Sequence, residues 1–183
     1  MSCQDDAEAP WLAPTRQLIS RTVRAGTPFL GICLGHQLAT VALGGQVCTS
    51  DHFCLGAAEM HLTPEGKKDP LLSVYDGHRG IHFNNDVAVV LPEDAVLLAR
   101  DPTGQIEAVR FAERAWGVQF HPECTPEIFD AWTIGHGEKE WQQRLPWSEA
   151  VTVAETVRRD IDTVNAEEAF AARFQELIDP EKR

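Results

Sequence analysis

The chain has 183 residues, of which 43% are hydrophobic, and a formal net charge of −12. This length suits one domain with a sizeable core, and the acidic balance argues against a surface for nucleic acids or anionic membranes. The first twenty residues are polar and acidic. We therefore expect neither a signal peptide nor a membrane span, and we expect a cytoplasmic location.

The cysteines predict free thiols. Their number is odd and they form no C-x-x-C pair, which suits a reducing compartment better than a disulfide framework. They are Cys3, Cys33, Cys48, Cys54 and Cys124. Cys48, His52 and Cys54 could be imagined as metal ligands, but their spacing matches no zinc signature. We expect no metal and no cofactor.

The first elements in chain order indicate an α/β protein. Apolar residues recur at helical spacing from Trp11 to Val23, and Gly26 provides a C-cap signal. The apolar run 28–32 predicts a strand that passes directly into a second helical stretch, 38–43. A glycine pair ends that stretch, and 46–48 begins another short extended piece. Helix, strand, helix and strand in succession are typical of α/β order.

Cys33 lies at the junction of the predicted strand and helix, with Gly31 and Gly35 on either side. Glycines let the backbone pack closely at such a sharp bend, so the pattern predicts a nucleophile elbow. The helix N-terminus favours a thiolate, which is the form that attacks carbonyls. The Leu34 amide would face negative charge on a carbonyl oxygen beside the sulfur. A buried cysteine in a glycine-containing turn is the alternative.

From 57 to 120 the pattern changes to short extended runs between turn signals. The runs are 59–62, 80–83, 95–99, 106–111 and 115–120. Turn sequences at 101–104 and 113–114 predict hairpins, so this part is expected to be antiparallel. The last run leads to His121, Pro122 and Glu123. Proline keeps His121 extended, so His121 and Glu123 should project to one side, with the carboxylate placed to hold the imidazole.

The other histidines receive different predictions. His36, on the helix after the elbow, has no carboxylate partner in view and is expected to pack or cap. His82 lies in an extended run and is a candidate for lining the site. We expect the remaining four to lie on the surface: His52, His61, His78 and His136.

The C-terminal part is predicted to be helical. Thr125 and Pro126 form a helix start, with a capping threonine and proline at the first helical position. From residue 146 onward, apolar residues at helical spacing predict a long amphipathic tail. We expect this tail to pack on the domain or on a second subunit.

Cys33, His121 and Glu123 make a nucleophile, base and orienter set. The segments 31–37 (GICLGHQ) and 117–123 (GVQFHPE) resemble those of the class I (triad) glutamine amidotransferases. The resemblance is closest to the amidotransferase domain of GMP synthase and its free-standing bacterial relatives. It implies a flavodoxin-like doubly wound α/β sheet with an antiparallel extension. It also implies an amidotransferase domain over 1–135 and a helical tail over 136–183.

The resemblance also implies roles for individual residues. Cys33 would attack the side-chain amide of glutamine, His121 would protonate the departing ammonia, and Glu123 would orient His121. A γ-glutamyl thioester would form and be hydrolysed to glutamate, and an ammonia-accepting synthetase chain would be a partner, with a homo-oligomer as another possibility. The Leu34 amide would be an oxyanion donor. The implied substrate contacts are Gln37, Phe83 and Asn84.

The chain departs from this family at two places. Asn84 stands where relatives usually have a second histidine. Relatives also have about fifty further residues before the first helix, including βα units and a Gly-Gly-Pro loop with a second oxyanion donor. From this we expect an exposed strand edge, self-association and little activity of the 183-residue chain alone. The sequence leaves two other functions open: a γ-glutamyl cysteine hydrolase, and a catalytically silent binding or regulatory subunit.

Overall fold

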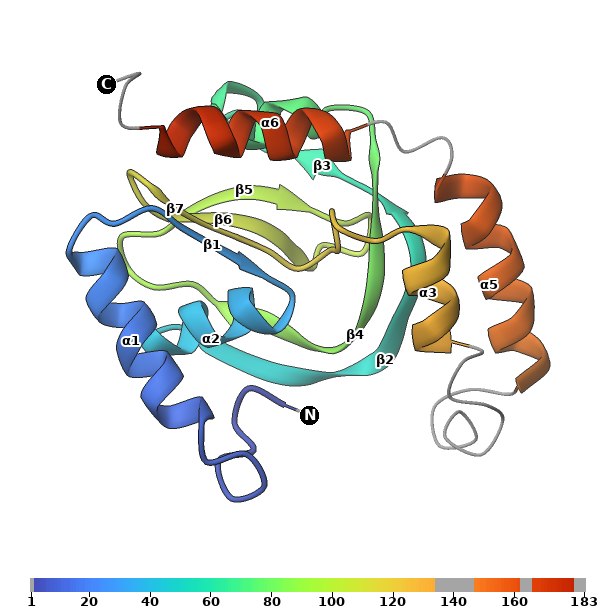
Figure 1. Ribbon diagram of the computed structural model, residues 1–183, viewed down its shortest axis with the longest axis horizontal. Coiled ribbons are helices and arrows are strands. Elements are labelled where there is room, and N and C mark those ends of the chain that lie inside the picture. Colours follow the sequence, from blue (N-terminus) through green and yellow to red (C-terminus); the bar gives the residue numbers. More distant parts are fainter. Residues whose placement is uncertain (1, 134–146, 162–165, 180–183) are drawn as a thin grey trace.

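A five-stranded mixed sheet forms the centre of the protein (Figure 1). The computed structural model describes residues 2–133, 147–161 and 166–179. The strand order is β1 (Phe29–Ile32), β7 (Ala115–Val118), β6 (Ile106–Ala112), β5 (Val96–Arg100) and β3 (His61–Leu62). β1 pairs with β7 in parallel and forms one edge of this sheet, and the other pairs are antiparallel. The structure therefore confirms the predicted α/β class and both hairpins, β5–β6 and β6–β7.

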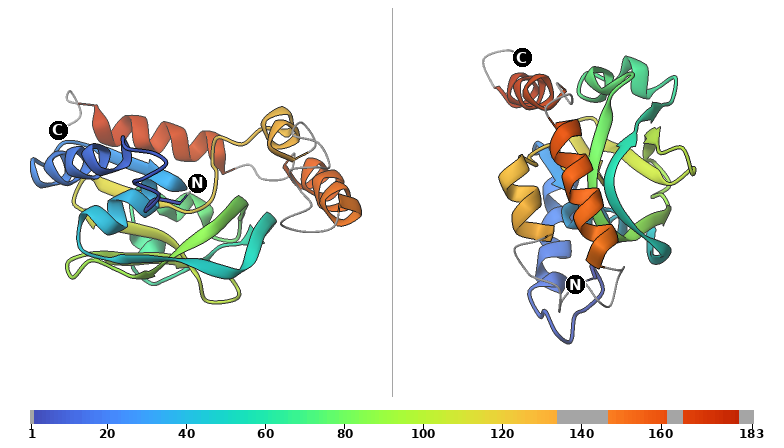
Figure 2. Two further views of the ribbon diagram at one scale, coloured as in Figure 1. Left: turned by 90° about the horizontal axis from the view of Figure 1, so that it is seen from below. Right: turned by 90° about the vertical axis from the view of Figure 1, so that its right-hand side faces the viewer.

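A second, two-stranded sheet curves beside the first (Figures 1 and 2). β2 (Gln46–Glu59) pairs antiparallel with β4 (Arg79–Val90), with a register shift between Thr49 and Cys54. The sequence predicted only short extended pieces here, so the length of both strands is a correction. The polar stretch 49–52 shows no strand alternation, and the pairing with β4 is interrupted after Thr49 and resumes at Cys54. Two short 3₁₀ helices connect β3 to β4: η1 (Gly66–Lys68) and η2 (Leu72–Tyr75).

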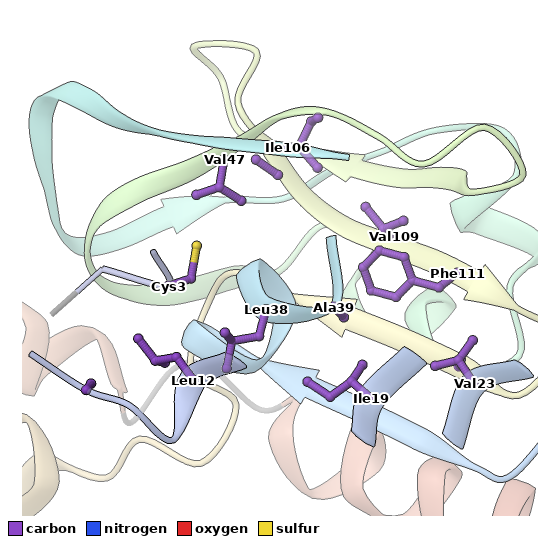
Figure 3. Packing of buried hydrophobic residues seen from close by; sticks show 13 residues of the cluster. Cys3, Leu12, Ile19, Val23, Leu38, Ala39, Val47, Ile106, Val109 and Phe111 are labelled. Atoms are coloured by element: carbon purple, nitrogen blue, oxygen red, sulfur yellow. The ribbon is translucent and has the colours of Figure 1, made fainter. Parts of the chain in front are cut away.

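Two helices pack into the core shown in Figure 3. α1 (Leu12–Arg24) and α2 (Leu34–Ala42) cover strands β6 and β7 with a cluster that includes Ile19, Val109 and Phe111. Gly26, with φ of +69°, follows the end of α1 as predicted. Successive strand residues face opposite sides. Thus Ala115 of β7 faces this cluster, and Trp116 faces a second hydrophobic cluster on the opposite side of the sheet.

Helix α6 (Glu167–Ile178) runs along the sheet and completes the second cluster (Figure 1). Phe174 meets the Trp116 ring edge-on, with ring centroids 6.4 Å apart. α3 (Pro126–Thr133) and α5 (Trp147–Ile161) pack against each other, and α5 contacts β2. Thr125 Oγ1 accepts a hydrogen bond from the Ile128 amide, which confirms the predicted start of α3.

The described residues of the expected helical tail form helices α5 and α6, and both pack on the rest of the chain. The predicted domain boundary between 135 and 136 lies outside the described residues, as does His136. Helices long and apolar enough to cross a membrane are absent from the described part of the chain. All five cysteines are free thiols. Within residues 2–133, 147–161 and 166–179, no three histidine, cysteine or acidic side chains gather as a metal site would require.

Candidate active site

Cys33 occupies a strained bend between β1 and α2. Its φ of +48° and ψ of −105° make it the one non-glycine residue with positive φ among those the structure describes. Such a conformation costs on the order of 1–3 kcal/mol, so the surrounding structure must enforce it. The Cys33 amide donates to the Val118 carbonyl at 2.8 Å, which fixes the bend to the end of β7. The elbow predicted from the sequence is present.

Gly31 makes this bend possible. A Cβ at Gly31 would lie 2.6 Å from the carbonyl carbon and oxygen of Gly35 and 2.8 Å from the His36 amide nitrogen. All of these are backbone atoms, which cannot move aside as the end of a side chain can. Gly35 differs, because a Cβ there would meet nothing within 4 Å. The strand can approach the first turn of α2 this closely only with glycine at 31.

This contrast gives a prediction with a matched control. We expect Gly31→Ala to lower the free energy of unfolding by at least about 3 kcal/mol, because the new methyl group overlaps the backbone of α2. Gly35→Ala should change it by no more than about 1 kcal/mol, since alanine favours helix and meets open space. Urea denaturation of both variants measures the difference. Equal stability of the two variants would show that the elbow tolerates a side chain at 31.

His121 and Glu123 lie beside each other as predicted. His121 Nδ1 and Glu123 Oε1 are 2.7 Å apart. The His121 amide donates to the Ile81 carbonyl of β4 at 2.8 Å, so the second sheet holds the histidine backbone in place. The Trp132 ring of α3 packs on the imidazole, with ring centroids 4.5 Å apart. Sequence reasoning missed Trp132, because nothing in the local pattern links α3 to the site.

The charges of this pair depend on Cys33. Burial alone would lower the pKa of His121, but interactions with Cys33 and Glu123 outweigh it and raise the pKa to about 9. Burial would likewise raise the pKa of Glu123, but its hydrogen bond with His121 and the charge of His121 lower it. Nδ1 is occupied by Glu123, and the buried Nε2 makes no hydrogen bond of normal length to any described residue. The raised pKa favours the imidazolium form of His121 at neutral pH, and its Nε2 has no hydrogen-bond partner among the described residues.

A cavity of about 250 Å³ opens beside Cys33. It is lined by Cys33, Leu34, Gln37, Phe53, Phe83, Asn84, Asn85 and Asp86. All three predicted substrate contacts, Gln37, Phe83 and Asn84, are among them. Sequence reasoning missed the other three residues from β2 and β4. Asn85 and Asp86 directly follow Asn84 and could have been included, but Phe53 lies in the stretch whose strand was not predicted.

The amide groups at this cavity are ordered by β4. Gln37 Nε2 donates to the Asp86 carbonyl at 2.8 Å, and Asn84 Nδ2 donates to the same carbonyl at 3.1 Å. Asn84 Oδ1 is buried and has no hydrogen-bond partner among the described residues. A bound donor at the cavity wall would satisfy this oxygen.

Two other histidines, His36 and His82, are buried in the structure away from the cavity at Cys33. His36 is fully buried and packs against Phe111, which confirms the packing prediction, and burial lowers its pKa to about 4. His82 does not line the cavity at Cys33. Its Nε2 lies 2.7 Å from Glu107 Oε2 in a buried ion pair, beside a separate cavity of about 200 Å³. Burial opposes protonation of His82, but the charge and hydrogen bond of Glu107 outweigh it and raise the His82 pKa.

The arrangement as a whole has the parts for attack on a carbonyl. A cysteine lies at a helix N-terminus, an imidazole whose pKa is raised by interaction with it lies near by, and a carboxylate oxygen lies 2.7 Å from that imidazole. The amides of the first turn of α2, beginning with Leu34, have no acceptor within the helix and can face negative charge. The family model "Glutamine amidotransferase class-I" matches residues 7–135. The chain belongs to this family.

Individual class I amidotransferases show the same relationship. The chain is 37% identical over 115 residues to a glutamine-hydrolysing GMP synthase of Marinobacter nauticus, covering 55% of this chain and 20% of that enzyme. It is 34% identical over 101 residues to one subunit of the glutamine-hydrolysing GMP synthase of Methanothermobacter thermautotrophicus, covering 52% and 51%. The chain thus spans about a fifth of one relative and about half of the other.

A solved structure confirms the fold. A glutamine amidotransferase of Thermotoga maritima superposes with a TM-score of 0.79 at 20% identity, covering 98% of this chain and 74% of that one. The class I amidotransferase fold predicted from the two sequence segments is therefore correct.

Proposed function

We propose that this chain hydrolyses the side-chain amide of glutamine through Cys33, His121 and Glu123, and that the ammonia serves an acceptor enzyme. One observation carries the proposal. The residue held in a strained elbow beside the cavity is a cysteine, and its interaction with His121 helps raise the pKa of that histidine to about 9. A buried cysteine in an ordinary turn would need neither the strain nor the charged partner.

The reaction follows from the positions of these groups. The Cys33 sulfur attacks the side-chain carbonyl carbon of glutamine, and the resulting oxyanion faces the Leu34 amide. His121 gives its Nε2 proton to the departing nitrogen, which leaves as ammonia, and a γ-glutamyl thioester remains. Neutral His121 then takes a proton from water, the hydroxide adds to the thioester, and glutamate leaves with the Cys33 thiolate and the protonated His121 restored.

The cavity suits the other end of a small polar substrate. Its volume of about 250 Å³ fits a single amino acid better than a large peptide. The unpartnered Asn84 Oδ1 can accept a hydrogen bond from an α-ammonium group. In this proposal Phe83 forms the apolar side of the cavity. Its ring meets the Trp132 ring at a centroid distance of 5.7 Å, which connects the substrate side of the site to the histidine side.

The acceptor enzyme is proposed from the relatives. The relative from Methanothermobacter thermautotrophicus is one subunit of a GMP synthase, which indicates that a separate subunit completes that enzyme. We propose a synthetase chain as the partner that uses the ammonia released here.

Purified chain incubated with glutamine tests the proposal, alone and with a synthetase subunit of the GMP synthase type. We expect glutamate and ammonia to appear in equal amounts, with little release from the chain alone. A γ-glutamyl peptide serves as the comparison substrate. Faster hydrolysis of the peptide would identify a γ-glutamyl hydrolase instead. Absence of any release under both conditions would identify a silent binding subunit.

A further inference from the structure

Gln119 is a fully buried polar residue two positions before His121. Its backbone amide donates to the Glu107 carbonyl at 2.8 Å, which continues the pairing of β7 with β6 beyond Val118. By strand alternation its side chain faces the same side of the sheet as Gly117, where a Cβ would lie 2.5 Å from His36 Nδ1 of α2. The side chain is thereby directed toward the elbow.

The Gln119 side chain contacts the Cys33 sulfur. Gln119 Nε2 donates to Cys33 Sγ at 3.5 Å, and Gln119 Oε1 accepts from Gln37 Nε2 at 3.2 Å. Gln37 Nε2 also donates to the Asp86 carbonyl at 2.8 Å. The two amides thus form a buried chain of hydrogen bonds from the β4 backbone to the nucleophile.

This chain fixes which end of each amide points where. The Asp86 backbone oxygen can only accept, so Gln37 must present its amide nitrogen there. The second hydrogen on that nitrogen then points at Gln119, whose side-chain oxygen must accept the hydrogen bond. Gln119 is left with its NH₂ group against the sulfur. An N–H donor stabilises a negative sulfur more than a neutral thiol.

We infer that Gln119 is a further member of the catalytic machinery, which holds the Cys33 sulfur and stabilises its thiolate. This inference rests on the proposed role of Cys33 as nucleophile. Gln119 makes this contact from the β7 side, whereas the α2 amides act from the helix. The Gln119 amide also stabilises the thiolate that leaves when the γ-glutamyl thioester breaks, because the leaving sulfur meets the same N–H donor.

Alkylation of Cys33 tests the inference without glutamine. The rate of modification by iodoacetamide is measured from pH 5 to 10, with mass spectrometry to follow Cys33 alone. Gln119→Met keeps the length of the side chain and removes the donor. We expect its alkylation rate at pH 7 to fall about tenfold, and the midpoint of its pH profile to move to higher pH.

A matched control comes from Gln105, whose Oε1 accepts from Cys54 Sγ at 3.5 Å. Gln105→Met should leave the Cys33 profile unchanged. Gln119→Glu retains an acceptor for Gln37 and keeps the shape of the side chain, and it serves where Gln119→Met does not fold. A carboxylate beside the sulfur should slow alkylation at pH 7 further still.

Alkylation of Cys33 within twofold of the native rate in a folded Gln119→Met or Gln119→Glu chain would overturn the inference. Failure of the proposed function looks different. In that case glutamine is not hydrolysed by the native chain, yet the alkylation profiles of the Gln119 variants still differ from the native one.

Discussion

Replacing Cys33 by alanine should abolish glutamine hydrolysis, with a loss on the order of a millionfold if the triad acts as a unit. Alanine removes the atom that forms the thioester and leaves the His121–Glu123 pair without its partner. Glutamate release under saturating glutamine measures the effect. The variant should remain folded for two reasons. Alanine keeps a Cβ in the same strained conformation, and the hydrogen bond from the residue 33 amide to the Val118 carbonyl does not involve the side chain.

Cys48→Ala is the matched control for this variant. Cys48 is an exposed residue of β2 and is absent from the lining of the cavity at Cys33. Its loss should leave turnover unchanged within about twofold, as for other surface substitutions away from a site. Activity retained in Cys33→Ala but lost in Cys48→Ala would contradict the elbow assignment directly.

His121→Ala should be nearly as damaging as loss of Cys33, because it removes the group that we propose protonates the leaving nitrogen. Glu123→Gln should be less damaging, by roughly tenfold to a hundredfold, because the imidazole stays in place but loses its orienting charge. Initial rates of glutamate release measure both variants. Equal retention of activity in the two variants would show that His121 is only a residue at the end of β7.

The pH dependence of glutamine hydrolysis further distinguishes the role of His121 from that of Glu123. His121 must be protonated to act as an acid, and its pKa is about 9, so native activity should be lost as the pH rises through about 9. Glu123 contributes to raising that pKa. In Glu123→Gln the alkaline loss should therefore begin at lower pH. An unchanged alkaline limb in this variant would mean that a group other than His121 sets it.

The elbow and the His121–Glu123 pair could be predicted because both are local. A glycine two residues before the cysteine and a proline after the histidine fix the backbone over a few positions. The His121 amide is then placed by a single long-range bond to Ile81, which adds precision without changing the direction of the side chain. Such features remain readable in a sequence without knowledge of the pairing between distant strands.

The long β2–β4 sheet could not be predicted, because its cause is pairing across the chain. The polar segment before Phe53 has no alternation of its own, and it lies where the pairing with β4 is interrupted between Thr49 and Cys54. For the same reason Phe53 was missing from the predicted site. His82 was misplaced because its partner, Glu107, lies 25 positions away on β6 and is buried with it. Gln119 lies inside a predicted motif, yet its contact with Cys33 depends on how β7 meets the elbow.

Reaction with a diazoketone analogue of glutamine tests the central claim most directly. Such an analogue binds where glutamine binds and alkylates the nucleophile that attacks it. The measurement is the mass of each cysteine-containing peptide after brief exposure, with excess glutamine as competitor. We expect one equivalent at Cys33, protection by glutamine, and no label in the other four cysteines. Label at Cys48, Cys54 or Cys124 while Cys33 stays unmodified would contradict the account.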